Sequence, residues 1–238
     1  KVFYETFANV KKQPALILKT NGATYSIMDR EETLTKINQI KSQFPKDWKL
    51  PNVYLLHGDL SPEEMNYLYN HPKVKCFVSF THGEGYGRPL QEATMVGLPV
   101  IASNWSGQLD FLDTEKSLLL SGTMVQVPKS TVWKDIIIEQ SQWFTIDELK
   151  ASATLKYAYA NEYEIKNRAS SLMTINRDKF TYKKMSETLN NIVDDYVKNI
   201  PTHVELNLPT LKKKSNSTTQ DIKLPKLKKT TNTEGVSV

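Results

Sequence analysis

The stretch that reads Gly83-Glu84-Gly85-Tyr86-Gly87-Arg88-Pro89-Leu90-Gln91-Glu92-Ala93 holds three of the nine glycines of the chain within five residues. It follows an apolar run that ends near Phe80 and precedes a pattern of apolar residues with helical period. This order predicts a strand, then a glycine-rich loop, then the start of a helix. Pro89 suits the first position of that helix.

A loop of this kind is suited to an anionic ligand. Free backbone N–H groups and the helix dipole at a helix N-terminus favour an anion such as phosphate, and glycines let the backbone approach it closely. Neither of the two common phosphate-loop patterns is present.

Two carboxylates, Glu84 and Glu92, flank the loop with seven residues between them. Acids beside a diphosphate cannot bind phosphate, but they can accept hydrogen bonds from hydroxyl groups, each worth roughly 1.5–3 kcal/mol. The combination predicts a nucleotide-sugar site. Two plainer readings stay open, because Glu92 can simply complement the helix dipole and two acids at this spacing are common by chance.

The first half of the chain alternates short β-branched runs with amphipathic stretches, which predicts an α/β, Rossmann-like parallel sheet with helices on both faces. Ligands of such sheets bind beyond the carboxyl ends of the strands. The expected strands are Ala15–Lys19, Val53–Leu56, Cys76–Phe80, Val100–Ala102 and Ser117–Leu120, and the expected helices are Thr33–Phe44, Pro62–Asn70 and Pro89–Val96.

The second half lacks glycine between Gly122 and Gly235 and reads as helices over Ile146–Ala160, Glu162–Asn176 and Tyr182–Lys198. A capping box of Thr145 and Glu148 is expected at the first of them. We therefore expect a Rossmann-like nucleotide-sugar-binding domain over residues 1–145, helices that pack on it over residues 146–200, and a disordered Lys-rich tail over residues 201–238.

Composition narrows the function classes. The chain has 238 residues, 39% of them hydrophobic, and a net charge of +5. Residues 199–238 hold seven lysines and three acids, a net +4, so the rest of the chain is nearly neutral and no nucleic acid is expected as a partner. The tail repeats Leu-Pro-x-Leu-Lys-Lys and reads as a solvated terminus or as a peptide for an acidic partner or peripheral membrane contact. The single cysteine, Cys76, fits the core of a protein in a reducing compartment, so a cytoplasmic location is expected.

Residues 83–93, followed by Gly97-Leu98-Pro99-Val100-Ile101-Ala102-Ser103, resemble the signature of the family 4 retaining glycosyltransferases. The resemblance runs from about Val2 to about Asp195. It implies the C-terminal, donor-binding half of a GT-B fold, which would transfer a sugar from a nucleotide-diphosphate sugar to a hydroxyl of a glycan, lipid or protein. It implies a hexosyltransferase type of enzyme that needs no metal or other cofactor.

The resemblance also assigns roles to residues. It places Glu84 on the donor sugar, as the expected catalytic residue, and Glu92 on the ribose hydroxyls. Backbone amides of the loop would lie against the sugar and diphosphate, and a turn after the next strand would contribute Gly107. The expected donor-binding residues are Gly83, Gly85, Tyr86, Gly87, Arg88, Pro89, Glu92, Gly58, Leu60 and Gly107.

Two features depart from the family. The basic pair that the family places on the diphosphate would precede Lys1, and the acceptor-binding N-terminal domain has no counterpart, so we expect a truncated enzyme. Two other functions stay open: a GT-B nucleotide-sugar epimerase or phosphorylase, and a non-catalytic nucleotide-sugar-binding module. His57 and His82 either line the cleft or are ordinary strand-end residues.

Overall fold

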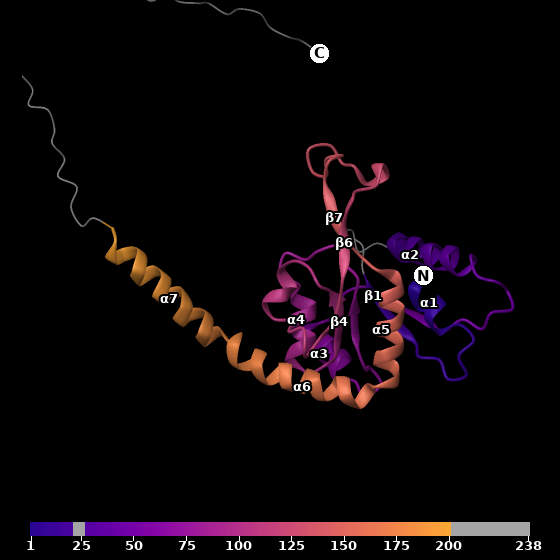
Figure 1. Ribbon diagram of the computed structural model, residues 1–238, viewed down its shortest axis with the longest axis horizontal. Helices are drawn as coiled ribbons and strands as arrows, with labels where there is room; N and C mark the ends of the chain where they lie inside the picture. The colour runs from indigo at the N-terminus through magenta and orange to yellow at the C-terminus, as the bar shows by residue number, and fades with distance from the viewer. Residues whose placement is uncertain (21–26, 201–238) are drawn as a thin grey trace, which may run out of the picture. The chain divides into compact units, whose positions relative to one another are not determined.

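The computed structural model describes residues 1–20 and 27–200 (Figure 1). One compact unit comprises Lys1–Asn191, and residues from Ile192 onward belong to a second. The strands are β1 (Leu16–Thr20), β2 (Val53–His57), β3 (Phe77–Ser79), β4 (Val100–Ser103), β5 (Leu118–Leu120), β6 (Gly122–Gln126) and β7 (Gln142–Ile146). The α-helices are α1 (Val2–Phe7), α2 (Ile27–Lys41), α3 (Pro62–Asn70), α4 (Arg88–Met95), α5 (Glu148–Ala160), α6 (Glu162–Lys179) and α7 (Tyr182–Lys198), and the short 3-10 helices are η1 (Gly107–Asp110) and η2 (Lys129–Thr131).

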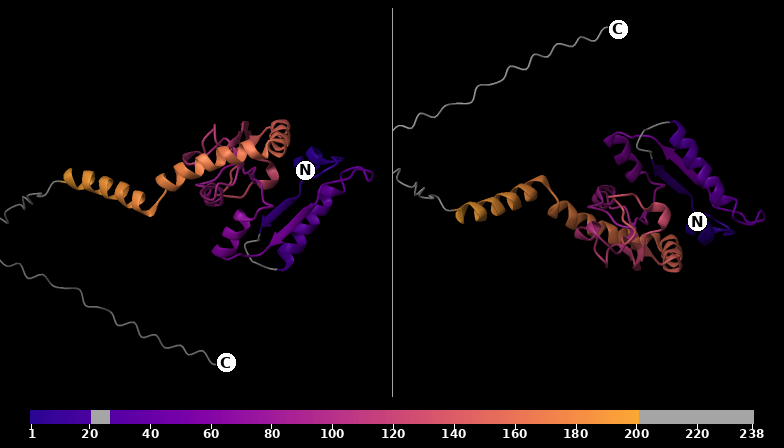
Figure 2. Two further views of the ribbon diagram at one scale, coloured as in Figure 1. Left: turned by 90° about the horizontal axis from the view of Figure 1, so that it is seen from below. Right: turned by 90° about the horizontal axis from the view of Figure 1, so that it is seen from above.

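Five of the strands are parallel, which confirms the α/β fold class. Strand β1 pairs with β2 and puts Leu16 opposite Val53. Strand β4 lies between β3 and β5. Within the described residues the five strands thus form two parallel groups, and β1 and β3 do not pair with each other. Helix α2 lies alongside the β1–β2 pair (Figure 2).

Strand β4 is the centre of the core. All four of its residues are buried, as expected for a parallel strand covered on both faces. Because side chains alternate along a strand, Val100 and Ala102 face one layer and Ile101 faces the other. The two layers belong to two separate hydrophobic clusters.

Helices form both layers. The first cluster joins β4 to α3, α4 and α6, and the second joins β4 and β5 to α1, α5 and α6, with Cys76 packed against it as expected. Buried residues of the first are Tyr69, Leu90, Ala93, Leu98, Val100, Ala102, Phe111, Leu112 and Leu172. Those of the second are Phe7, Ile101, Leu120, Ala151, Leu155, Ala158 and Ile165.

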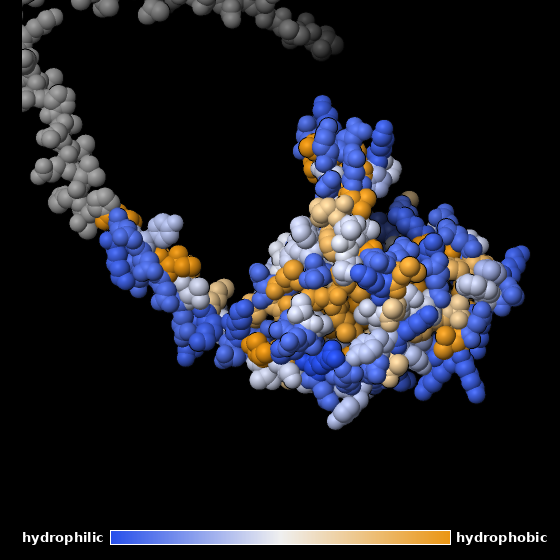
Figure 3. Space-filling model, in the orientation of Figure 1, coloured by the Kyte–Doolittle hydropathy of each residue, from blue (hydrophilic) through white to orange (hydrophobic). Residues whose placement is uncertain are grey.

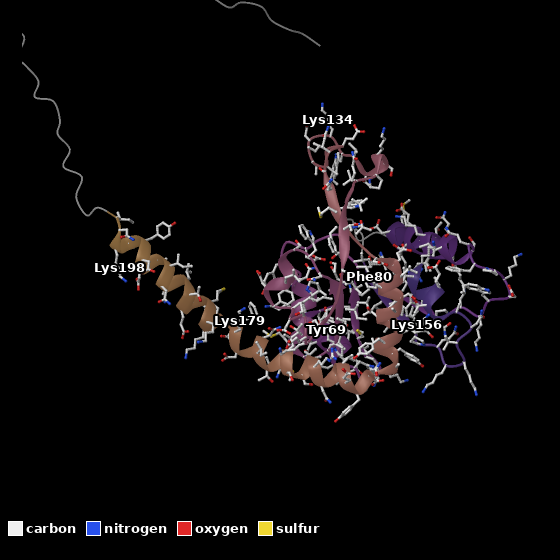
Figure 4. All side chains as sticks on the ribbon, in the orientation of Figure 1. Tyr69, Phe80, Lys134, Lys156, Lys179 and Lys198 are labelled. Atoms are coloured by element: carbon white, nitrogen blue, oxygen red, sulfur yellow. The ribbon has the colours of Figure 1, made fainter. Side chains whose placement is uncertain are left out.

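A β-hairpin that the sequence analysis did not predict follows β5. Strands β6 and β7 pair antiparallel and project from the sheet as an arm (Figure 1), defined here as residues 122–146. Lys134 lies at its tip (Figure 4). Apolar side chains appear between polar ones on its surface (Figure 3), and Trp133 is 64% exposed.

Two helix starts differ from the expectations by more than one residue. Helix α2 begins at Ile27, six residues earlier than expected. The capping box predicted at Thr145 is wrong, because Thr145 pairs with Thr123 in the arm and Asp147 caps α5 by accepting hydrogen bonds from the amides of Leu149 and Lys150. The predicted disordered tail and its repeat lie outside the described residues.

Helix α6 is fastened to the site-bearing layer by a buried amide. The Asn176 side chain is 2% exposed and donates hydrogen bonds to Oγ1 of Thr94 (2.8 Å) and to the carbonyl of Phe111 (3.1 Å). An amide buried with both of its N–H groups bonded stabilises the packing, because removing it leaves acceptors without a partner in a place that water does not reach.

We expect Asn176→Ala to lower the free energy of unfolding by about 1–3 kcal/mol, because the Phe111 carbonyl loses a buried partner. Urea unfolding followed by circular dichroism measures this. The control Asn167→Ala removes an exposed amide of the same helix and should change stability by less than about 0.5 kcal/mol. Equal effects of the two variants would contradict this role of Asn176.

Candidate functional site

The candidate site lies where β3 and β4 end at the same edge of the sheet. Ser79 pairs with Ala102, so the loop after β3 and the turn after β4 leave the sheet side by side. The hydroxyl of Ser103, the last residue of β4, donates to the carbonyl of Thr81 (3.1 Å). We call residues 83–87 the glycine loop and residues 104–108 the brace turn. The carboxyl edge of a parallel sheet is where the ligands of this fold class bind.

The glycine loop runs directly into α4. Gly87 is the N-cap residue, with φ 88°, a left-handed conformation that disfavours residues with a side chain. Its carbonyl accepts from the amides of Leu90 (2.9 Å) and Gln91 (3.1 Å), which starts the helix. No described side chain caps this end of α4. Pro89 has no N–H, and the amides of Leu90 and Gln91 are bonded to Gly87, so the Arg88 amide is the one in this first turn without a partner among the described residues. Together with the helix dipole, this amide can bind an anion.

The brace turn holds the glycine loop by its backbone. The carbonyl oxygen of Glu84 accepts two hydrogen bonds, from the amide of Gly107 (3.1 Å) and from Oγ of Ser106 (2.8 Å). A Cβ on Gly107 would lie 2.1 Å from the carbonyl oxygen of Gly85, so only glycine allows this approach. The predicted residues Gly83, Glu84, Gly85 and Gly107 thus meet in one place.

A buried amide supports the brace turn from beneath, and the sequence analysis did not identify it. Gln108 is fully buried, and its Nε2 donates to both the carbonyl and the hydroxyl of Ser103, each at 3.0 Å. Since Ser103 also binds Thr81, one polar chain joins the ends of β3 and β4. The sequence analysis expected ligands beyond the carboxyl ends of the strands, and so near the loop after β4. No motif in the sequence singled out Gln108 within that loop.

The two predicted carboxylates have different surroundings. Both are half-buried, and Nε of Arg88 pairs with Oε1 of Glu92 at 3.2 Å. Arg88 is 84% exposed, so this ion pair is screened by water and contributes little to stability. Burial raises the pKa of the nearby Tyr69 hydroxyl to about 12, and the Glu92 carboxylate adds to the rise. Tyr69 therefore stays neutral beside Glu92 at ordinary pH.

The remaining predicted residues are placed as follows. Tyr86 is 38% exposed, packs on Phe111, and accepts a hydrogen bond from Gln91. Pro89 lies in the first turn of α4. Gly58 and Leu60 follow β2, in the other group of strands.

The region after β2 has a geometry of its own. Gly58 has φ 110°, and its carbonyl accepts from Nζ of Lys19 at 2.7 Å. Leu60 lines a shallow hollow of about 400 Å³ between β2 and α3, which includes no residue of the glycine loop. Of the predicted site residues, Leu60 alone lines this hollow. We place the site at the glycine loop, because the uncapped helix end and the two carboxylates are there.

Aromatic rings join the arm to the site. The ring of His82, which precedes the glycine loop, is parallel to that of Trp143 with centroids 4.1 Å apart, and its Nδ1 lies 2.7 Å from the carbonyl oxygen of Phe144. Phe144 in turn stacks with Trp105 of the brace turn at 5.6 Å. The base of the arm thus contacts both segments of the site.

Among residues 1–20 and 27–200, no three His, Cys, Asp or Glu side chains lie close enough together to hold a metal ion. Over the same ranges, no helix has both the length and the apolar character that crossing a membrane would require.

Comparison with known proteins agrees with this architecture. A family model described as glycosyl transferases group 1 matches residues 2–142, more than half of the chain. No curated protein matches this chain.

Solved structures of similar fold include the Anabaena protein HepE (Alr3699) in complex with UDP and glucose, with 13% sequence identity and a TM-score of 0.55 over 82% of this chain and 44% of that one. A sucrose-phosphate synthase of Thermosynechococcus elongatus has 14% identity and a TM-score of 0.55, over 83% of this chain and 41% of that one. A glycosyltransferase of Rickettsia africae has 13% identity and a TM-score of 0.56, over 84% and 44%. The chain spans less than half the length of each, and at this identity the likeness concerns the fold.

We expect Gly107→Ala to lower the free energy of unfolding by about 1–3 kcal/mol, because its Cβ would overlap the Gly85 carbonyl and force the two segments apart. Gly85→Ala is the matched control, since a Cβ there meets no atom within 4 Å, and it should cost less than about 1 kcal/mol. Urea unfolding of both variants measures the difference, and equal losses would show that the close approach does not constrain the loop.

Proposed function

We propose, on the premise that this chain belongs to the glycosyl transferases group 1 family, that it is the donor-binding domain of a family 4, retaining glycosyltransferase. It binds a nucleotide-diphosphate sugar and presents it for transfer to a hydroxyl group of a glycan, lipid or protein. The observation that carries the proposal is the uncapped N-terminus of α4 directly after a glycine loop held from behind by the brace turn.

The diphosphate binds at the start of α4. There the Arg88 amide has no partner among the described residues, and no side chain caps the helix. When the bond to the sugar breaks, negative charge develops on the diphosphate. Dipoles that are already oriented stabilise that charge without reorganising, so they assist the leaving group. No metal is assigned to this step.

The carboxylates bind hydroxyl groups. Glu84 lies inside the loop, and its backbone is fixed by two hydrogen bonds to its carbonyl, which suits it to bind the donor sugar near the reacting carbon. Glu92, one turn into α4, accepts from the ribose hydroxyls. Its ion-pair partner Arg88 is exposed and can turn toward the diphosphate when the donor binds.

We further propose that the active enzyme has a second, acceptor-binding domain. The chain spans 41–44% of the solved structures of like fold described above. In a doubly wound sheet of order 3-2-1-4-5-6, a further parallel strand would lie between the positions of β1 and β3, and this strand would join the two parallel groups. The 238-residue chain alone then binds its donor and transfers sugar poorly.

Isothermal calorimetry with UDP-glucose, GDP-glucose and ADP-glucose tests the proposal. Glucose is the first choice because HepE was solved with UDP and glucose. We expect one donor to bind and Glu92→Ala to weaken it about 10- to 100-fold, since a charged hydrogen bond to a buried hydroxyl is worth roughly 1.5–3 kcal/mol.

Glu115→Ala, which removes an exposed acid on the loop before β5, is the control and should leave affinity unchanged. If the unaltered chain binds none of the three donors, or if both variants bind equally well, the donor-domain proposal is wrong.

A further inference from the structure

The side chain of His82 is exposed, yet two contacts restrain its ring. It lies on the surface, directly before the glycine loop and two residues before Glu84. One face of its ring is covered by Trp143, with the ring planes 1° from parallel, and one of its nitrogens is bonded to the backbone of β7. Neither contact buries the ring, so burial does not explain this double restraint.

The hydrogen bond fixes which nitrogen carries the proton. A carbonyl oxygen can only accept, so Nδ1 must donate to the Phe144 carbonyl 2.7 Å away. In the neutral ring Nε2 then has a lone pair and is an acceptor. None of the described residues hydrogen-bonds to Nε2. The restraint therefore leaves one chemical function exposed at the edge of the site, a hydrogen-bond acceptor with a fixed direction.

The restraint comes from the arm. Trp143 and Phe144 are neighbours in β7, and their register against Val125 and Met124 of β6 fixes how far along the sheet edge they lie. Phe144 also stacks on Trp105 of the brace turn. The same strand thus sets the position of His82 relative to the turn that holds Glu84.

We propose that His82 determines sugar specificity in the donor site, with Nε2 accepting a hydrogen bond from a hydroxyl of the donor sugar, and that Trp143 is its positioning residue. This inference rests on the proposed function. An acceptor is the complement of a hydroxyl and not of a phosphate, and Glu84, the next polar side chain along the loop, is also an acceptor when ionised. The two residues would bind two hydroxyls of one sugar.

Two substitutions of His82 distinguish the role of Nδ1 from the role of Nε2. The amide nitrogen of Asn matches the place of Nδ1 and keeps a donor for the Phe144 carbonyl, whereas a Gln amide reaches the place of Nε2. We expect His82→Asn to weaken binding of the donor sugar nucleotide by about 2- to 12-fold, the effect of one neutral hydrogen bond, and His82→Gln to weaken it less. Binding of the matching sugar-free diphosphate should not change in either variant.

Calorimetry with UDP-glucose and UDP, and with the GDP and ADP pairs, gives these values. Unchanged affinity of His82→Asn for the nucleotide sugar would overturn the inference, as would an equal loss for the nucleotide sugar and the free diphosphate. Failure of the unaltered chain to bind any of them would instead refute the proposed function, and this inference with it.

Nitrogen-15 NMR of the imidazoles tests the positioning role without any ligand. His71 is an internal control, because its Nδ1 accepts from the amide of Lys73 at 3.2 Å and so must carry its proton on Nε2. At a pH where both rings are neutral, we expect His82 to show the opposite tautomer from His71.

Trp143→Ala removes the ring that holds the imidazole in line with the Phe144 carbonyl, so the exposed His82 can leave that bond. We therefore expect a mixture of tautomers for His82 and no change for His71, and Trp143→Phe should restore a single form. A proton on Nε2 of His82 in the unaltered chain, or a single tautomer in Trp143→Ala, would overturn the positioning role.

Discussion

The close approach of Gly107 to the backbone of Gly85 is the constraint on which the site depends. A glycine loop is flexible by itself, and a flexible loop would lose conformational entropy on each binding event. Here the loop is fixed by two hydrogen bonds to the Glu84 carbonyl, and those bonds form only because Gly107 has no side chain to hold the segments apart. The loop can therefore keep its small residues, which a ligand needs for access, without being mobile.

The rest of the fold keeps this contact in place. Strand β4 is buried between two helical layers, so its end at Ser103 has little freedom. Gln108 and Ser103 transmit that rigidity to the brace turn, and the Ser103 hydroxyl ties the start of the loop. Asn176 fixes α6 against α4 and the chain after the brace turn. Each of these side chains is buried and makes at least one hydrogen bond, although Oε1 of Gln108 has no partner among the described residues, so loss of one would disturb the site.

The features that could be predicted from the sequence are those set by residues close together along the chain. The strand, loop and helix around residues 83–93 were found because glycine, proline and apolar period each act within a few residues, and the parallel α/β fold followed from the alternation of such units. The brace turn's hold on Glu84 joins residues 22 apart, and the bond between His82 and Phe144 joins residues 62 apart. No pattern along the chain indicates such pairs. The arm was missed because β6 is mostly exposed and neither of its strands has a clear alternation of buried and exposed residues. The wrong capping box arose because Thr145 pairs within that arm.

Hydrogen–deuterium exchange of the 238-residue chain, with and without UDP-glucose, GDP-glucose or ADP-glucose, tests the central claim most directly. If the glycine loop and the start of α4 hold a nucleotide-diphosphate sugar, the donor that binds will slow exchange of the amides of residues 83–88 and of Gly107. Binding that protects only the hollow beside Leu60, and leaves residues 83–88 and Gly107 unchanged, would contradict it.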